Sequence, residues 1–541
     1  MMRVACYSDE GSSLLRACRP ARALATLAVL AALVAGCAAS GSGDVDRTAA
    51  TGGTLRVANA NEYGDQDPHD YNGDWFIAPM VFETLVKYGQ GGRLEPGLAT
   101  SWQVAADGLT IDFELRTGVK FHDDTPFDEQ AAKWNLDRWV GKESHSWLAA
   151  SKIIKAVEVP GPMKLRLRLE RAYDPLLQEL TFTRPPGFMS PKAVDASGKF
   201  TKAIGTGPWR LEQITTTAAS LVRNDGYWGA KPKIDRVEFS VRKDSQTRVS
   251  ALRAGEVDML GGSYLAPISP TEAVTLGKDE RVTVLHGDPD ITVMLGFNLN
   301  GIAGDKAIRE AVRYALDRET LTKVLYAGQA KAATTLFAPG IPDAGAPQSL
   351  PFDPDQARRI LDAAGWRQEG KGRVKDGKQL VLSLRIPSTA AVGWQDSRLS
   401  AQAVASALGE VGITVNIVAV DEATFYDDLH AGKYDLAFME TYGAPYDPSG
   451  FVVGFLTGDR KDPGLWKTDE VERLIDGALY ARDAATRAKN YQDAWAVLNR
   501  EAAFVPIAYR PRVWAVGPAV KGFQVPHTEY DFDLSTVTLQ R

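Results

Sequence analysis

The chain has 541 residues, of which 44% are hydrophobic and 24% charged, and its formal net charge is −6 at pH 7. This length exceeds what one hydrophobic core normally fills, so two or more domains are expected. The balanced composition excludes a disordered or collagen-like chain, and the acidic net charge argues against nucleic acid as a partner.

The N-terminus has the pattern of an export signal. Arginines precede a short apolar run, residues 23–35, which is too short to span a bilayer and is typical of a secretory signal peptide. Residues 34–37 (VAGC) resemble a bacterial lipobox, in which Cys37 is lipidated and becomes the first mature residue; an ordinary signal peptide with a chance cysteine is the alternative. We expect a lipoprotein signal peptide at 1–36 and a flexible tether at 37–53.

The positions of the cysteines bear on the chemistry of the exported protein. All three, Cys6, Cys18 and Cys37, lie at or before the expected cleavage point. An exported chain without a thiol other than its anchor has no disulfides, no CxxC redox chemistry and no thiolate metal site. We therefore expect an extracytoplasmic protein that is anchored to the cell membrane as a lipoprotein.

Strand and helix patterns alternate along the rest of the chain. Residues 54–59 read as a strand, and residues 110–116 and 164–170 alternate strictly between apolar and polar, as half-buried strands do. Residues 305–327 predict one amphipathic helix with Asp305 as its N-cap and a glycine just past its end.

Two further aspartates have the sequence context of helix N-caps. Asp353 precedes a proline and a helix that ends before Gly365. Asp128 lies in an acidic cluster that resembles paired carboxylates, but its position before an alanine-rich helix favours an N-cap over catalysis.

Residues 412–440 predict a βαβ unit. A strand at 412–420 is followed by a helix capped by Asp421 and then by a second strand at 434–440, which should run parallel to the first. The loop that begins at Thr441 then lies at the carboxyl end of a strand, where open α/β sheets bind ligands.

A similar helix–glycine–strand pattern occurs twice in the chain. Residues 251–260 (ALRAGEVDML) and 428–438 (DLHAGKYDLAF) both place Ala-Gly after a helix and an aspartate before a strand. Either chance or a related unit in each of two domains explains the likeness.

The motifs of common enzyme classes are missing from the sequence. The six histidines never fall at i,i+3 or i,i+4, and neither HExxH nor GxSxG occurs. Residues 365–372 nearly match a P-loop, but glycine stands where the magnesium-binding Ser or Thr belongs. We therefore expect a protein that is not an enzyme and has no resident cofactor.

Several blocks make the chain resemble the family 5 extracytoplasmic solute-binding proteins, the dipeptide, oligopeptide and nickel receptors of ABC importers. The blocks, which run in order from near Thr54 to the C-terminus, are residues 81–127, GTGPWRL at 205–211, 221–239, LGFNLN at 295–300 and FVPIAY at 504–509. The resemblance implies an α/β, two-lobed periplasmic-binding-protein fold (type II, cluster C-like) with mixed sheets and a ligand cleft between the lobes.

The same resemblance implies the domain order. Lobe I would comprise residues 54–292, with a subdomain inserted at about 95–200, and would resume at 510–541 after lobe II at 293–509. Hinge closure of the lobes around a ligand would present a closed surface to the permease.

Three more blocks resemble the nickel-binding receptors in particular, at residues 142–151, 176–191 and 441–451. Those receptors hold a metal within a small, carboxylate-rich chelator. The resemblance assigns Arg184 to a ligand carboxylate and makes Trp147 and Tyr446 aromatic walls of the pocket. A salt bridge for Arg184, a core position for Trp147 and turn packing for Tyr446 are the structural alternatives.

The chain departs from the nickel receptors at other positions of these blocks. Ser144 stands where they have a second arginine, and Tyr442 stands where they have a tryptophan. Their metal-coordinating histidine has no counterpart, since no histidine lies between His430 and His527, and His145 is the nearby substitute. No metal ligand is therefore assigned, and nickel or another transition metal would enter as part of the ligand.

The chain also departs from the peptide receptors. These place an aspartate in the loop after Thr441 to pair with the α-amino group of the ligand, where this chain has Ala444. Asp447 is expected to act as a turn acceptor instead.

Together these inferences predict a monomeric receptor that feeds the permease subunits of an ABC importer, with a metal–chelator complex or a related carboxylate-bearing small ligand as cargo. A peptide or opine-like ligand is the alternative within this class, and a secreted hydrolase or periplasmic chaperone is the remote one.

Overall fold

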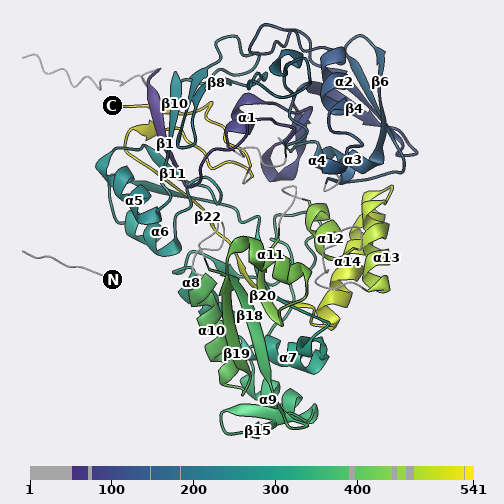
Figure 1. The fold of residues 1–541 in the computed structure, drawn as a ribbon, viewed down its shortest axis with the longest axis vertical. Helices are drawn as coiled ribbons and strands as arrows, with labels where there is room; N and C mark the ends of the chain where they lie inside the picture. Colours follow the sequence, from purple (N-terminus) through teal and green to yellow (C-terminus); the bar gives the residue numbers. More distant parts are fainter. Residues whose placement is uncertain are drawn as a thin grey trace, which may run out of the picture. The chain divides into compact units, whose positions relative to one another are not determined.

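The computed structural model describes residues 52–70, 76–145, 148–182, 184–388, 397–441, 447–457, 468–528 and 530–541. The signal peptide and Cys37 lie outside these residues. Within them, most strands belong to two large sheets and one smaller antiparallel sheet (Figure 1). No helix in these ranges is both long and apolar enough to cross a membrane.

The first large sheet has seven strands and is mixed. In spatial order they are β12 (Thr283–Gly287), β22 (Arg512–Val516), β11 (Met259–Gly261), β1 (Thr54–Asn59), β10 (Arg236–Val241), β9 (Ala218–Arg223) and β8 (Trp209–Ile214). β1 runs parallel to β10 and β11, and its bounds are those predicted from the sequence.

The second large sheet has six strands. In order they are β14 (Lys331–Ala332), β21 (Phe504–Tyr509), β13 (Thr292–Phe297), β20 (Leu436–Glu440), β18 (Val381–Pro387) and β19 (Thr414–Val420). β18 is parallel to both β19 and β20, so the predicted βαβ strands are parallel to each other, with β18 between them. The chain passes between the two large sheets at residues 288–291 and again at 510–511.

The third sheet and three small pairings complete the β-structure. The third sheet has the order β4 (Ala99–Val104), β5 (Thr110–Leu115), β7 (Lys164–Leu169) and β6 (Ile154–Gly161). The small pairings are β2 (Val86–Tyr88) with β3 (Leu94–Pro96), β15 (Arg367–Glu369) with β16 (Gly372–Lys375) and β17 (Lys378–Gln379), and β23 (Val520–Lys521) with β24 (Thr538–Leu539). β5 and β7 alternate between buried and more exposed residues, as the sequence predicted.

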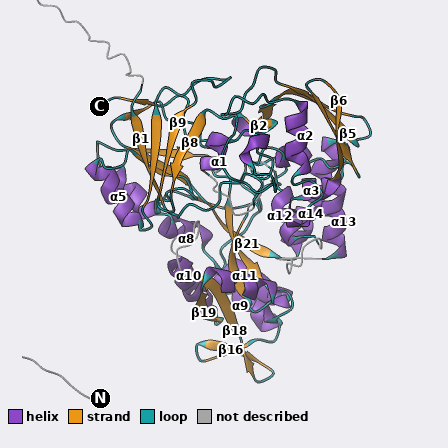
Figure 2. Cartoon of the chain, turned by 45° about the horizontal axis from the view of Figure 1, so that its top comes forward, coloured by secondary structure: helices purple, strands orange, loops and turns teal. Residues whose placement is uncertain are grey.

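The helices cover the faces of these sheets, and α10 packs along β18 and β19 (Figure 2). Their bounds are α1 Ile77–Val81, α2 Glu129–Asp137, α3 Ala149–Ile153, α4 Leu176–Glu179, α5 Ser245–Ala254, α6 Pro270–Leu276, α7 Lys306–Ala315, α8 Arg318–Leu325, α9 Pro354–Ala363, α10 Ser397–Gly409, α11 Glu422–His430, α12 Ser449–Phe455, α13 Asp469–Leu479 and α14 Ala484–Arg500.

Aspartate N-caps begin many of these helices. The four that were predicted, Asp128, Asp305, Asp353 and Asp421, each accept a hydrogen bond from a backbone N–H of the first turn. Because this bond satisfies one of the free N–H groups at a helix start, each cap fixes where its helix begins.

The prediction of one continuous helix at 305–327 was wrong. α7 ends at Ala315, and Leu316 is extended. Asp317 then accepts from the backbone N–H of Thr320 and begins α8. The apolar periodicity continues through the break, so only the capping aspartate indicates where the second helix starts.

The GTGPW block has a structural role in this fold. A Cβ on Gly205 would lie 1.9 Å from the carbonyl oxygen of Val81, and one on Gly207 would lie 2.5 Å from that of Met80. The N–H of Gly207 donates to the Val81 oxygen at 2.9 Å. Two glycines are therefore needed for this segment to pack against the end of α1.

Glu83 connects the GTGPW block to the GYWG block, residues 226–229 within the block at 221–239. Its carboxylate accepts from Thr206 Oγ1 at 2.7 Å, from Tyr227 OH at 2.8 Å and from Trp228 Nε1 at 2.8 Å. Burial raises the pKa of the Glu83 carboxyl, and the three hydrogen bonds oppose that rise. Glu83 thus joins Thr206 to the aromatic pair Tyr227 and Trp228 through one carboxylate.

The repeated helix–glycine–strand pattern has the same backbone geometry at both places. α5 is followed by Gly255 with φ of 71°, and α11 by Gly432 with φ of 64°. Both glycines adopt the left-handed conformation that favours glycine after a helix.

The aspartates of the two repeats also make matching hydrogen bonds. The N–H of Asp258 donates to the oxygen of Arg56 at 2.7 Å, and its carboxylate accepts from the Arg56 N–H at 2.8 Å. The N–H of Asp435 donates to the oxygen of Ser383 at 3.1 Å, and its carboxylate accepts from the Ser383 N–H at 2.8 Å. In both, the partner lies on a parallel neighbouring strand, so the two large sheets share a related unit.

Candidate ligand-binding site

The site residues predicted from the sequence fall into two groups. Arg184, Ser144 and His145 lie in the described part of the chain, whereas Trp147, Tyr442 and Tyr446 lie outside it. Arg184 is 2% exposed and His145 is 8% exposed, while Ser144 is exposed.

The segment that follows Arg184 is held to three different elements. The Phe188 N–H donates to the oxygen of Glu83 at 2.9 Å. Met189 exchanges two hydrogen bonds of 2.9 Å with the side chain of Asn135 on α2. The Ser190 N–H donates to Ile204 at 2.8 Å. Because these bonds fix the backbone from 188 to 190, the arginine extends from a well-supported turn.

His145 uses both ring nitrogens within the protein. Its Nε2 donates to the carbonyl oxygen of His69 at 2.5 Å, and its Nδ1 lies 3.0 Å from Ser144 Oγ. The histidine considered as a substitute metal ligand is therefore a buried, hydrogen-bonded side chain.

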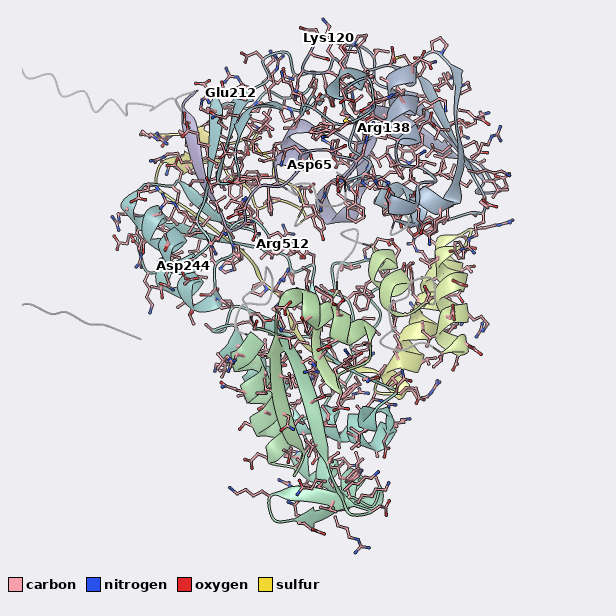
Figure 3. All side chains as sticks on the ribbon, viewed as in Figure 1. Asp65, Lys120, Arg138, Glu212, Asp244 and Arg512 are labelled. Atoms are coloured by element: carbon pink, nitrogen blue, oxygen red, sulfur yellow. The ribbon has the colours of Figure 1, made fainter. Side chains whose placement is uncertain are left out.

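His69, which the sequence analysis did not select, lies beside these residues. Its Nε2 lies 3.0 Å from the oxygen of Gly187, and Arg138 Nε donates to its Nδ1 at 3.0 Å. Figure 3 labels Arg138, which directly follows α2, and Asp65 in the segment that leads to His69. Burial lowers the pKa of the His69 imidazole to about 3, and the charge of Arg138 acts in the same direction.

Asp447 lies just after the predicted ligand loop. It is buried, and its Oδ1 accepts from the Ser449 N–H at 2.7 Å, which confirms its predicted role as a turn acceptor. Burial raises the pKa of the Asp447 carboxyl to about 6; Asp174 adds to the rise, and Ser449 and Arg487 oppose it.

The residues before the predicted ligand loop are tied to the two connections between the large sheets. The Thr441 N–H donates to the Thr292 oxygen at 3.0 Å, and the Thr292 N–H donates to Thr441 Oγ1 at 2.8 Å. Arg510 Nη1 donates to Glu440 Oε2 at 2.7 Å, and the Arg510 N–H donates to the Ile291 oxygen at 2.9 Å. Glu440 is therefore bonded to the second connection, and Thr441 to the first residue of β13, directly after the first connection.

A further ion-pair group joins α14 to the segment before α4. Arg487 pairs with Asp174 and, through Nε, with Asp343 Oδ2 at 2.8 Å. Close by, the guanidinium of Arg171 lies over the ring of Tyr480. These contacts link the segment before α4 to α14 and to the residue that ends α13.

A cavity lies beside Arg510, where the segment after β11 faces α8 and the start of α10. Ser263, Ile268, Leu325, Ser400 and Val513 are among its lining residues. Within the described ranges, no group of three or more His, Cys, Asp or Glu side chains is arranged to hold a metal ion.

The chemistry that sequence reasoning missed is in the supporting residues. His69 follows Asp67 and Pro68 in a short turn, and Glu83 lies inside a block that was used only for its resemblance. The signal that could have found Glu83 is an acidic residue in an apolar stretch, because a charge inside a core is costly unless it has partners. A histidine in a turn is a weaker signal for His69.

Comparisons with known proteins find a family and similar folds that cover most of the chain. A family model, described as bacterial extracellular solute-binding proteins, family 5 middle, matches residues 93–463. The nickel-binding periplasmic protein of Escherichia coli (strain K12) is 32% identical over 464 residues, which cover 82% of this chain and 87% of that protein.

Two solved structures are similar over most of the chain. An ABC transporter substrate-binding protein from Sinorhizobium meliloti is 39% identical, with a TM-score of 0.77, and the match covers 90% of this chain and 100% of that one. NikA from Brucella suis, in complex with Fe(III)-EDTA, is 32% identical, with a TM-score of 0.85 and the same coverage. The mixed α/β fold predicted from the sequence is confirmed by these two matches.

Proposed function

The chain belongs to the bacterial extracellular solute-binding proteins of family 5, which are substrate-binding receptors of ABC importers and not enzymes, and on that premise we propose that its cargo is a metal–chelator complex of the nickel type or a related small carboxylate-bearing ligand. The support for this cargo is the likeness to the nickel-binding protein and to the Fe(III)-EDTA complex of NikA.

The observation that carries the proposal is the burial of Arg184 on a supported turn. A guanidinium presents a planar fork of donors that matches a carboxylate, and charge-assisted hydrogen bonds strengthen when water is excluded. Such a contact contributes roughly 1.5–3 kcal/mol. Trp147, Tyr442 and Tyr446 are proposed to cover the faces of the chelate, since rigid rings lose little conformational entropy on binding.

The metal is proposed to arrive already coordinated by its chelator. The ring nitrogens of His69 and His145, the histidines beside Arg184, are engaged in hydrogen bonds within the protein. Neither imidazole can ligate a metal without giving up such a bond, which costs about 0.5–1.5 kcal/mol or more when the partner stays buried. Recognition would then act on the carboxylates and shape of the complex.

Lobe movement is the second part of the proposal. Residues 54–292 with 510–541 would form one lobe and 293–509 the other, with residues 288–291 and 510–511 as the hinge. Such closure orders the cleft and creates the surface that the permease recognises. We also propose that Cys37 carries the lipid anchor; Cys37→Ala should release the protein from membranes, and retention of this variant on membranes would exclude the anchor.

The cargo is tested by titrating intrinsic tryptophan fluorescence with nickel alone, with EDTA alone and with the preformed complex. A response to the complex at much lower concentration than to either component supports a chelate as cargo. A response only to peptides would favour the peptide alternative, and no response to any carboxylate-bearing ligand would remove the proposal.

A pair of variants tests the role of Arg184. Arg184→Ala should raise Kd for the complex roughly 10- to 150-fold, which corresponds to the loss of 1.5–3 kcal/mol. Arg168→Ala is the matched control, because Arg168 lies exposed on β7 and pairs with Glu158. Equal affinity of Arg184→Ala and the control would reject the assigned role.

A further inference from the structure

His69 lies where three segments of the candidate site meet. Its carbonyl oxygen accepts from His145, and its ring contacts the oxygen of Gly187, which follows Arg184 by three residues, so His69 joins its own segment to both. The side chain is 5% exposed, so these bonds form away from bulk water.

The partners of His69 determine its protonation state. Arg138 Nε can only donate, so Nδ1 must accept and carries no proton. The carbonyl oxygen of Gly187 can only accept, so Nε2 must carry the proton and donate. One neutral tautomer satisfies both contacts, and a doubly protonated ring would place a donor against the Arg138 guanidinium.

The neighbouring charges reinforce this state. Arg138 also lies 3.5 Å from Asp67 Oδ2 and donates to the oxygen of Gly198 at 3.0 Å, so the guanidinium is fixed in place. Asp67 Oδ1 accepts from the His69 backbone N–H at 2.9 Å, which orients the residue as a whole. The charged and titratable groups facing the ring are therefore Arg138 directly after α2, Asp67 on its own segment and His145.

We propose that His69, as the neutral Nε2–H tautomer, is a positioning residue of the ligand site: its bond to Gly187 fixes the turn from which Arg184 reaches the carboxylate of the cargo. This inference rests on the proposed function of Arg184. The bonds of residues 188–190 hold the far side of the turn, and the bond from His69, among the contacts that the described residues show, holds Gly187.

Two polar substitutions distinguish the contact of His69 Nε2 with Gly187 from the contact of its Nδ1 with Arg138. His69→Gln can place an amide N–H near the position of Nε2 and an oxygen toward Arg138. His69→Asn keeps an oxygen toward Arg138, but its shorter side chain does not reach the oxygen of Gly187. We expect His69→Asn to raise Kd for the metal–EDTA complex about 10-fold and His69→Gln to stay within about threefold of wild type.

A double-mutant cycle with Arg184→Lys distinguishes positioning from general destabilisation. Lysine keeps the positive charge but not the planar fork, so binding persists and depends less on orientation. In that background His69→Asn should change Kd less than twofold. A 10-fold loss in both backgrounds would show that His69 acts independently of Arg184 and would overturn the proposal, as would wild-type affinity of His69→Asn.

A ligand-free measurement covers the case in which the substitutions prevent folding. In nitrogen-15 spectra of histidine-labelled wild-type protein, the imidazole assigned to His69 should stay in the neutral Nε2–H form down to pH 5. A Nδ1–H form for His69, or its protonation above pH 5, would overturn the proposal. If the wild type binds no carboxylate ligand, the proposed function falls and this inference with it, whereas binding that depends on Arg184 but not on His69 removes only the inference.

Discussion

Replacement of Glu83 tests whether its carboxylate holds the GTGPW and GYWG blocks together. Glu83→Leu would leave three donors without an acceptor, those of Thr206, Tyr227 and Trp228. Thr206 is fully buried, and the two aromatic residues are half-buried. An unsatisfied buried donor costs about 1–3 kcal/mol, and removing a desolvated charge offsets part of the sum. We expect a net loss of about 3–4 kcal/mol in the free energy of unfolding.

Glu83→Gln is the matched control for this substitution. The amide oxygen can accept from Thr206 and Trp228, and the amide N–H can donate to the hydroxyl oxygen of Tyr227, so all three side chains keep a hydrogen bond to position 83, with Tyr227 now the acceptor. The expected loss is at most about 1 kcal/mol. Chemical denaturation followed by tryptophan fluorescence measures both. Equal losses for Gln and Leu would refute the reasoning, because packing alone would then explain the effect.

The pH dependence of the free energy of unfolding, compared between wild type and Glu83→Gln, provides a second readout. A carboxyl group whose folded-state pKa is raised contributes stability that is present below its unfolded value of 4.5 and is lost as pH rises through the folded value. Glu83→Gln removes this contribution. The variant should therefore gain stability relative to wild type between pH 4 and pH 7, and a difference that does not change with pH would contradict the raised pKa.

Three other substitutions follow from the structure. Gly205→Ala should prevent stable folding, because the added Cβ meets backbone atoms of Val81. Gly161→Ala is the control, since its Cβ would point into open space, and it should change the unfolding midpoint little. Equal midpoints of the two variants would contradict the packing argument. Arg487→Met removes the pair with Asp174 and should increase the radius of gyration of ligand-loaded protein in X-ray scattering; an unchanged radius would show that the pair does not hold the lobes. Burial lowers the pKa of His122 to about 4, so the unfolded state binds more protons between about pH 6.5 and 4, and the free energy of unfolding falls as pH falls through that window. His122→Gln should reduce the slope of the unfolding free energy against pH by up to about 1.4 kcal/mol per pH unit. An unchanged slope would exclude His122 as its source.

Local patterns in the sequence predicted much of the fold. The strand at 54–59 has an apolar pattern that sequence reasoning can follow, and the caps at Asp128 and Asp421 are decided by contacts within a few residues. The break between α7 and α8 was missed because both helices bury apolar residues with one continuous period. A capping aspartate inside such a run is the only sign of a restart.

The candidate site could be predicted only in part. Arg184 came from resemblance, since nothing in its local sequence distinguishes a ligand-binding arginine from a structural one. Its supporting residues come from segments far apart in the chain: His69 and Gly187 are 118 positions apart, and Glu83 and Trp228 are 145 apart. Hydrogen bonds across such distances depend on the folded topology, and single-sequence patterns carry no record of them.

The bonds at the base of the ligand loop have a consequence for the kinetics of transport. Thr441 is joined to Thr292, the first residue of β13, and Glu440 to Arg510, so under the proposed function a displacement at the start of the loop would be passed on to β13 and to residues 510–511. The opening and shutting rates of the receptor can therefore be altered at these four residues while the surfaces that touch the guest stay intact. A transporter could in this way release the same cargo faster or slower without any change in what it selects.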